Sequence, residues 1–311
     1  MPLTRQFIAR AAMAACAFLA STVSLAAGAD TPASAMPNAS AAQPVSSTAA
    51  AQSYLDRRAA FKTHLIHKGH SPQPFKVQSP PAGVREVVYP SGQLALKAWV
   101  ALPAGASSDK KVPGVVFFHG GYAFGAGDFE DARPFLDAGF AVMTPTLRGE
   151  NGNPGDFEML LGEVDDASAA IDWFATQPEV DASHIYTFGH SAGGIVSALL
   201  SLRPVPIRHG GSSGGLYGMR AFDFDWLKGS VPFALDDPHE REMRVLVGNL
   251  QWMQQKHYAF VGAGDPDQEV GLVKGEIRPG TPLVVTVIPG DHFTSLAPAV
   301  KAYIEVIRGE P

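Results

Sequence analysis

The residues best suited to chemistry in this sequence are serines within the pattern Gly-x-Ser-x-Gly. One copy, Gly189 to Gly193, lies between the apolar run IYTF and the helix-like run IVSALLSL. A sharp strand-to-helix turn exposes a serine Oγ, and its crowded backbone needs small neighbours. The start of the following helix also favours negative charge developing near the serine. We therefore predict Ser191 as a nucleophile; the alternative is a tight turn that needs small residues only for structural reasons.

A second segment, HGGSSGGLYG (His209 to Gly218), fits the same pattern twice, with Ser212 or Ser213 at its centre. It is dense in glycine, and no helix-forming run follows it directly. We expect a flexible loop here and no nucleophile.

Two later strand ends supply an acid and a base. Asp265 follows the apolar run HYAFVG, with Asp267 as a competing acid, and His292 follows PLVVTVIPGD just before the last helix. A carboxylate can hold the tautomer of an imidazole, and an imidazole can take the serine proton and later return it. The chain order Ser191, Asp265, His292 favours a catalytic triad over loop capping or a surface histidine. Asp291 is expected to support the loop.

A third strand end provides candidate donors for an oxyanion. His119-Gly120-Gly121 follows the apolar run of residues 112–118 and precedes the serine by many residues. Glycines let backbone amides approach a negatively charged oxygen. We predict the Ala192 amide as one donor; the second is the amide of Gly121, the amide of Tyr122 or the Tyr122 hydroxyl.

The elements that position these groups are alternating strands and helices. Residues 84–103 form two β-rich runs around Pro90-Ser91-Gly92 and indicate a hairpin. Continuous apolar runs, typical of strands buried on both faces, recur later in the chain: VPGVVFF, FAVMTPT, HIYTFG, HYAFVG and PLVVTVI. Helical spacing marks residues 54–67, 158–176 and 295–307, residues 237–255 have a helix-like pattern, and a helix ends near Gly139. This alternation predicts an α/β fold with a mostly parallel sheet covered on both faces.

Composition narrows the function further. The chain has 311 residues and a net charge of −6, with no block of Lys or Arg, which argues against nucleic acid or an anionic membrane surface as partner. Its ten histidines lack metal-ligand spacing. We therefore expect neither a metal nor another cofactor, and the oligomeric state is left open.

The N-terminus indicates export. Arg5 and Arg10 precede a short apolar run and small residues, so residues 1–29 are predicted to be a signal peptide for a periplasmic or secreted protein. Residues 30–53, rich in Ala, Ser, Pro and Thr, are expected to be a flexible linker, and residues 54–83 an N-terminal extension. Lipid attachment at Cys16, the only cysteine, is the alternative; the run is too short for a comfortable membrane span.

Residues 84–307 resemble the α/β-hydrolase superfamily, in particular the catalytic domain of the prolyl oligopeptidase group and its esterase-like relatives. The resemblance rests on His119-Gly-Gly, Arg148-Gly149, GHSAGG around Ser191, GAGDP and PGDHF. It implies an α/β-hydrolase fold over residues 84–311, with the triad at Ser191, Asp265 and His292. Dienelactone-hydrolase relatives are similar in size, but serine replaces their cysteine nucleophile.

The resemblance has one departure, which bears on the substrate. Peptidases of the prolyl oligopeptidase group carry a large β-propeller, and the residues before Val84 are too few for two blades. We therefore expect cleavage of small carboxylic esters, with short peptides as the alternative and a catalytically silent binding protein as a third reading. Residues 206–255 are expected to form a small cap whose Trp226 and other aromatic side chains contact the acyl group. Arg148 and Glu150 are expected either to bind a polar substrate group or to form internal salt bridges.

Overall fold

The computed structural model describes residues 53–215, 217–218, 222, 229–265 and 277–310. These residues build an eight-stranded sheet in the order β1-β2-β4-β3-β5-β6-β7-β8. The strands are β1 (Val84–Ser91), β2 (Leu94–Ala101), β3 (Val112–Phe118), β4 (Ala141–Pro145), β5 (Val180–His190), β6 (His209–Ser213), β7 (Lys256–Gly262) and β8 (Leu283–Ile288). Strand β2 pairs antiparallel with β1 and β4, and all other pairs are parallel.

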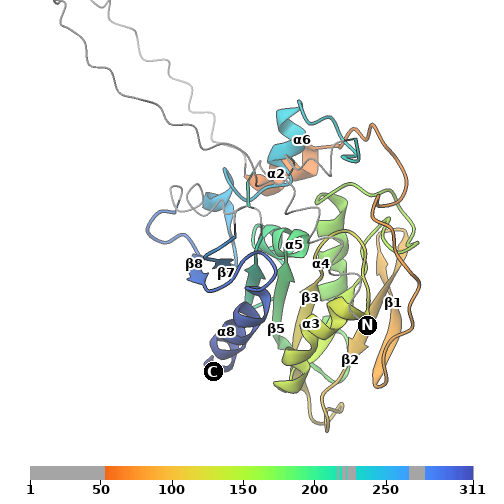
Figure 1. Cartoon of the computed structure of the whole chain (residues 1–311), viewed down its shortest axis with the longest axis vertical. Helices are drawn as coiled ribbons and strands as arrows, with labels where there is room; N and C mark the ends of the chain where they lie inside the picture. Colours follow the sequence, from red (N-terminus) through yellow and green to blue (C-terminus); the bar gives the residue numbers. More distant parts are fainter. Residues whose placement is uncertain (1–52, 216, 219–221, 223–228, 266–276, 311) are drawn as a thin grey trace, which may run out of the picture. The chain divides into compact units, whose positions relative to one another are not determined.

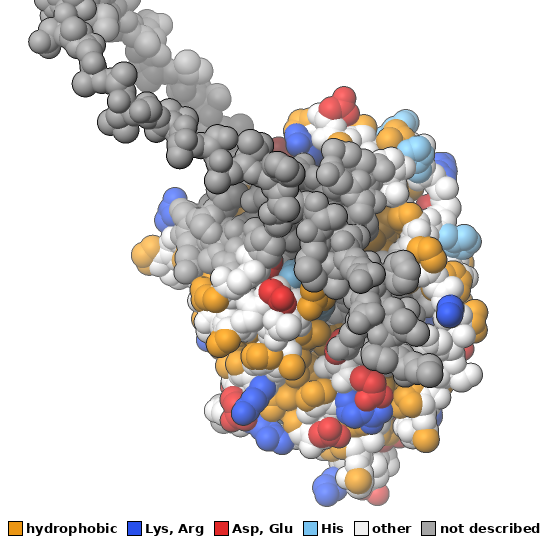
Figure 2. Space-filling view, in the orientation of Figure 1, with side chains coloured by type: hydrophobic (Ala, Val, Ile, Leu, Met, Phe, Trp, Pro, Cys, Tyr) orange, Lys and Arg blue, Asp and Glu red, His pale blue; other side chains and the backbone are white. Residues whose placement is uncertain are grey.

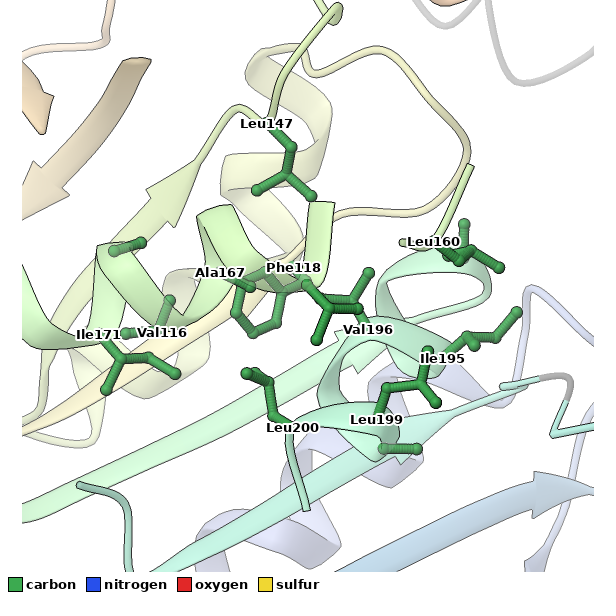
Figure 3. Packing of buried hydrophobic residues seen from close by; sticks show 14 of the residues in the cluster. Val116, Phe118, Leu147, Leu160, Ala167, Ile171, Ile195, Val196, Leu199 and Leu200 are labelled. Carbon is green, nitrogen blue, oxygen red and sulfur yellow. The ribbon is translucent and has the colours of Figure 1, made fainter. Parts of the chain in front are cut away.

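Helices cover both faces of this sheet (Figure 1). Side chains of β3 alternate between the faces: Val115 and Phe117 pack towards α3 (Ala126–Asp137) and α8 (Leu296–Arg308). Val116 and Phe118 pack towards α4 (Gly162–Ala175) and α5 (Ala192–Leu200), as Figure 3 shows. A strand buried on both faces needs apolar side chains at successive positions, which explains its continuous apolar run. The α/β architecture with a mostly parallel sheet is confirmed.

Strand β6 overturns the expected loop at residues 209–218. Ser212 and Ser213 pair with β5 and β7 and are fully buried. A Cβ at Gly211 would lie 2.8 Å from the Phe188 ring and 2.9 Å from the Tyr303 ring. The glycines here make room for neighbouring aromatic rings. The start of the predicted cap is also wrong, because β6 lies within residues 206–255.

The described residues after β6 hold shorter helices than expected. Residues 237–255 were expected to be one helix, but they contain α6 (Pro238–Glu242) and the 3-10 helix η3 (Leu250–Trp252). The Arg244 guanidinium is fully buried, pairs with Glu240 and lies 4.0 Å from the centre of the Phe233 ring. It also donates to the carbonyls of Glu158 and Met159, so a buried cation organises an irregular chain here.

The N-terminal extension packs against that same segment. Helix α2 (Tyr54–Ala60) begins at Ser53, whose hydroxyl accepts from the Asp56 amide, and ends seven residues before the predicted His67. Beyond it the chain is held by side chains of α6, because Glu240 accepts from the Thr63 hydroxyl and the His64 amide. The extension then continues to β1 as the orange trace of Figure 1.

The surface agrees with the mixed composition. On the face drawn in Figure 2, acidic and basic side chains are interspersed and do not gather into one patch. None of the helices formed by the described residues has the length and apolar character needed to cross a bilayer. The predicted signal peptide and Cys16 lie outside the described residues, as does the linker except for Ser53.

Candidate active site

Ser191 occupies a sharp turn between β5 and α5. Its φ of 53° and ψ of −119° are unusual for a residue with a side chain, and such strain persists only where the surroundings enforce it. A Cβ at Gly189 would lie 2.1 Å from the Gly193 carbonyl oxygen, and one at Gly193 would lie 2.2 Å from the Phe118 carbonyl oxygen. The glycines of the motif are therefore required by close backbone approach, as the sequence predicts.

The structure brings Ser191 together with both predicted partners. His292 Nε2 lies 3.0 Å from Ser191 Oγ, and His292 Nδ1 lies 3.1 Å from Asp265 Oδ2. Asp265 follows β7 and its side chain is buried; His292 lies on the loop between β8 and α8. In the tautomer with a proton on Nδ1, the ring donates to Asp265 and accepts from the Ser191 hydroxyl. The competing acid, Asp267, lies outside the described residues.

The loop that carries His292 is stabilised from two sides. Asp291 accepts from the Thr294 hydroxyl and from the amides of Phe293 and Thr294. These hydrogen bonds from Thr294 and Phe293 lower the pKa of the Asp291 carboxyl. Their effect is larger than that of the slight burial of the carboxyl, which by itself raises the pKa. The loop-supporting role predicted for Asp291 is confirmed.

His190 provides the second support, which the sequence analysis did not identify. Its Nε2 donates to the His292 carbonyl oxygen at 2.8 Å, and the two rings lie 5.1 Å apart. The residue before the nucleophile therefore fixes the backbone of the base. The only signal in the sequence is a polar, ring-bearing residue at the variable position of the serine motif, which is too general to predict this contact.

The predicted oxyanion donors differ in whether they already have a hydrogen-bond partner in the structure. The Tyr122 amide donates to Gln73 Oε1 at 2.8 Å, and the Tyr122 ring is buried 4.9 Å from the Phe157 ring, so burial raises the pKa of its hydroxyl. The amides of Gly121 and Ala192 have no hydrogen-bond partner among the residues that the structure describes. Both residues line one small cavity of about 10 Å³ with Val196. That volume is close to what one water molecule needs.

A buried ion pair lines the same cavity. His119 Nε2 donates to Glu150 at 3.1 Å, and both side chains are almost fully buried. Burial alone lowers the pKa of His119, but the charge and hydrogen bond of Glu150 outweigh it and raise the pKa to about 9. The imidazole is therefore cationic at neutral pH.

The structure favours internal salt bridges for the two candidate substrate-binding residues. Glu150 binds His119, and Arg148 makes a two-pronged contact with Asp166 and a further one with Glu158. The bidentate geometry joins the chain after β4 to helix α4. Trp226, the third candidate, lies outside the described residues.

Among the described residues, no cluster of three or more His, Cys, Asp and Glu side chains is arranged to hold a metal ion.

The fold agrees with known structures. The chain superposes on the dipeptidyl peptidase 4 of Porphyromonas gingivalis with a TM-score of 0.62 and 16% identity, over 73% of this chain and 35% of that one. The Pyrococcus furiosus esterase PF2001 gives a TM-score of 0.59 and 15% identity, over 78% of this chain and 96% of that one. This chain has the α/β-hydrolase fold. The superfamily resemblance seen in the sequence is confirmed.

Sequence comparisons place this α/β-hydrolase near peptidases. Residues 91–207 match the family model of the X-Pro dipeptidyl-peptidases (S15 family). The uncharacterized peptidase YtmA of Bacillus subtilis is 30% identical over 118 residues, which are 37% of this chain and 44% of that protein. The uncharacterized protein RP471 of Rickettsia prowazekii is 35% identical over 74 residues, or 24% of this chain and 31% of that protein. The matches thus span less than half of either relative.

Proposed function

We propose that this protein is a serine hydrolase that cleaves small carboxylic esters through an acyl-enzyme. The observation that carries the proposal is the continuous relay from Ser191 Oγ through the His292 ring to Asp265, with separations of 3.0 and 3.1 Å. A hydroxyl becomes a useful nucleophile when an oriented base lies within hydrogen-bond distance. The arrangement needs no cofactor.

The proposed reaction has two halves. Ser191 Oγ attacks the ester carbonyl while His292 Nε2 takes its proton, and the amides of Gly121 and Ala192 stabilise the resulting oxyanion. The carbonyl–alkoxy bond then breaks, and His292 gives its proton to the departing alcohol. In the second half, water attacks the acyl-enzyme, His292 takes a proton from it, and the carboxylic acid leaves as Ser191 regains its hydrogen. Asp265 orients the ring and stabilises its cationic form throughout.

The structural comparisons favour esters over peptides, because they cover very different shares of the matched esterase and the matched peptidase. The shared fold covers 96% of the P. furiosus esterase but 35% of the P. gingivalis dipeptidyl peptidase. The part in common is therefore nearly the whole esterase. Short peptides are the second candidate, favoured by the X-Pro dipeptidyl-peptidase model that matches residues 91–207.

The proposed triad is tested by labelling and by three substitutions. A fluorophosphonate probe is expected to form one adduct, mapped by mass spectrometry to Ser191, with Ser213→Ala labelling like the wild type. Ser191→Ala should lower kcat on the order of 10⁶-fold, as loss of a triad serine does elsewhere. Asp265→Asn should lower it about 10⁴-fold by stabilising the wrong histidine tautomer. An adduct on Ser212 or Ser213, or an active Ser191→Ala protein, would refute the proposal.

Substrate class is tested with matched leaving groups. We expect a higher kcat/KM for p-nitrophenyl acetate and butyrate than for X-Pro and single-residue p-nitroanilides. Faster turnover of the X-Pro anilides would assign the peptidase function instead.

We further propose that residues 1–29 direct export to the periplasm or the medium. The basic start, short apolar run and small residues support this. N-terminal sequencing of the protein from fractionated cells should find a start near Asp30. A start at Cys16 carrying lipid would indicate a lipoprotein, and an intact N-terminus in the cytoplasm would contradict export.

A further inference from the structure

The loop after β3, residues 119–125, depends on other segments for several of its backbone hydrogen bonds. The Tyr122 amide donates to Gln73 Oε1 at 2.8 Å, and the Tyr122 carbonyl accepts from the Ser71 hydroxyl at 2.6 Å. The Asn151 side chain both accepts from the Phe124 amide and donates to the Phe124 carbonyl. The conformation of this loop is therefore set largely by polar side chains from elsewhere in the chain.

Two of those side chains come from residues 69–78 of the N-terminal extension, which we call the strap. The strap is anchored independently of the loop: the Ser71 amide donates to the Gly149 carbonyl at 2.9 Å, and the Gly69 amide donates to Asp156. Gly69 also accepts from the Phe157 amide at 2.8 Å. These bonds to residues 149–157 give the strap a fixed base from which to contact the loop.

Gln73 is held in the strap between two prolines, Pro72 and Pro74. Proline fixes its own φ, and the residue before a proline is restricted to extended conformations. The backbone of Gln73 therefore has little freedom, and its side chain is presented in a narrow range of directions. Such a residue is suited to holding a neighbouring peptide group in one orientation.

The loop leaves room for the Gln73 side chain at Gly121. Gly121 has a φ of +70°, and a Cβ there would lie 2.6 Å from Gln73 Oε1. A side chain at residue 121 would therefore displace the glutamine. The preceding glycine adjoins the serine, because a Cβ at Gly120 would lie 3.6 Å from Ser191 Cβ.

We propose that Gln73 is a positioning residue for the oxyanion hole. By accepting from the Tyr122 amide it fixes the Gly121–Tyr122 peptide and thereby the path of the chain through Gly121, so that the Gly121 amide, in the preceding peptide, stays oriented to receive the oxyanion together with the Ala192 amide. This inference rests on the proposed serine hydrolase function. Preorganised donors accelerate acyl transfer because they need no reorientation as charge develops. A loop with two successive glycines has no such rigidity of its own.

The same contact is compatible with an opposite role for Gln73, which the experiment must distinguish from positioning. Gln73 Oε1 could itself be an internal ligand that competes with substrate for the oxyanion donors. Removing a competitor raises kcat/KM, whereas removing a positioning contact lowers kcat and leaves KM nearly unchanged. The two roles therefore predict changes of opposite sign.

The test compares two identical substitutions in one strap. Gln73→Met keeps the length of the side chain but removes the acceptor, and Gln78→Met is the control, because Gln78 Oε1 accepts from the Ala126 amide at 2.8 Å at the far end of the same loop. We expect Gln73→Met to lower kcat for an ester about tenfold, less than the ~10²-fold or more for deleting a donor. KM should change less than threefold, and Gln78→Met should stay within twofold of the wild type. A boronic acid that mimics the oxyanion should lose affinity in parallel with kcat.

A second measurement does not depend on activity. In a Ser191→Ala background, Gln73→Met should speed hydrogen exchange of the Tyr122 amide, while Gln78→Met should not. An unchanged exchange rate, a rise in kcat/KM, or equal losses in both methionine variants would overturn the proposal. If instead Ser191→Ala remains active, the proposed nucleophile is wrong, and the exchange experiment still reports whether Gln73 holds the loop.

Discussion

Two of the triad residues, Ser191 and His292, depend on neighbouring residues for their position. Ser191 has a positive φ that the glycines on either side permit, and Asp291 caps the loop of His292 with three hydrogen bonds. His190 fixes the backbone carbonyl of His292, the residue that carries the reacting imidazole. The distance between base and nucleophile is therefore set by several residues that do not react.

His190 can be tested without removing a reacting group. His190→Phe keeps a ring of similar shape but removes the donor to the His292 carbonyl, so the base should sample more orientations. We expect kcat for an ester to fall about tenfold with little change in KM, since a misplacement of about 1 Å can cost up to 10²-fold. The kcat from steady-state kinetics and the rate of labelling by the fluorophosphonate should decrease in parallel.

Thermal stability is the control measurement for this variant. The melting temperature of His190→Phe should remain close to that of the wild type, because one ring replaces another. A variant with unchanged kcat would show that His292 is held by Asp291 and Asp265 alone.

At the scale of elements, the turn between β5 and α5 is limited by space. Helix α5 begins directly after Ser191, and Gly193 in its first turn lies against the carbonyls at the end of β3. The helix can approach the sheet this closely only because a side chain is missing there.

This spacing predicts different results for two Gly→Ala changes in helices. In Gly193→Ala the Cβ would lie 2.2 Å from the Phe118 carbonyl oxygen, and we expect a loss of about 3 kcal/mol in the free energy of unfolding. Gly127→Ala, in the first turn of α3, meets nothing within 4 Å and should gain about 0.5–1 kcal/mol. Urea denaturation of both variants checks this. Equal effects would mean that the turn can relax.

The elements that the sequence predicted well are those whose signal is local. The hairpin of β1 and β2, the strands β3, β7 and β8, and helix α8 each have an apolar pattern of their own. The apolar run of β8 was wrongly expected to be buried on both faces, because Val284 and Val287 are exposed. Strand β6 has none, because its HGGSS residues pack through the rings of Phe188 and Tyr303 on other elements. The prediction of one helix over residues 237–255 was wrong for a related reason. Arg244, within this segment, is stabilised by residues far away in the chain, which a local pattern does not show.

The same distinction applies to the site. Ser191, Asp265 and His292 could be predicted because each follows a recognisable strand. Gln73 and His190 could not, because their contacts join residues 49 and 102 positions apart. Nothing in SPQPF or GHSAGG indicates which backbone group the polar side chain will meet. The triad follows from local patterns, whereas its supports follow from how distant segments pack.

At the scale of the whole molecule, two buried titratable groups should make stability depend on pH in opposite directions. Burial lowers the pKa of His257 to about 3, where it contacts the Ser212 hydroxyl inside the sheet. Burial also raises the pKa of Glu163 to about 7, although hydrogen bonds from the backbone amides of Glu158 and of Glu163 itself partly oppose this. Neither group belongs to the proposed triad, so both report on folding.

The signs follow from proton counting. Between pH 6.5 and 3 the unfolded chain binds a proton at His257 that the folded protein does not, so this residue reduces stability as pH falls. Between pH 7 and 4.5 the folded protein holds a proton on Glu163 that the unfolded chain has lost, so this residue increases stability as pH falls. From pH 7 to pH 5 each effect is about 2 kcal/mol, and in the wild type they nearly cancel.

Single substitutions should therefore reveal slopes that the wild type conceals. On going from pH 7 to pH 5, His257→Gln should gain stability of about 2 kcal/mol relative to the wild type, and Glu163→Gln should lose about the same amount. Urea denaturation at pH 5, 6 and 7 measures these slopes, and the double variant should return to the profile of the wild type. Parallel slopes in the two single variants would show that the two groups do not carry these opposite shifts, and that surface carboxylates set the acid limit of the fold.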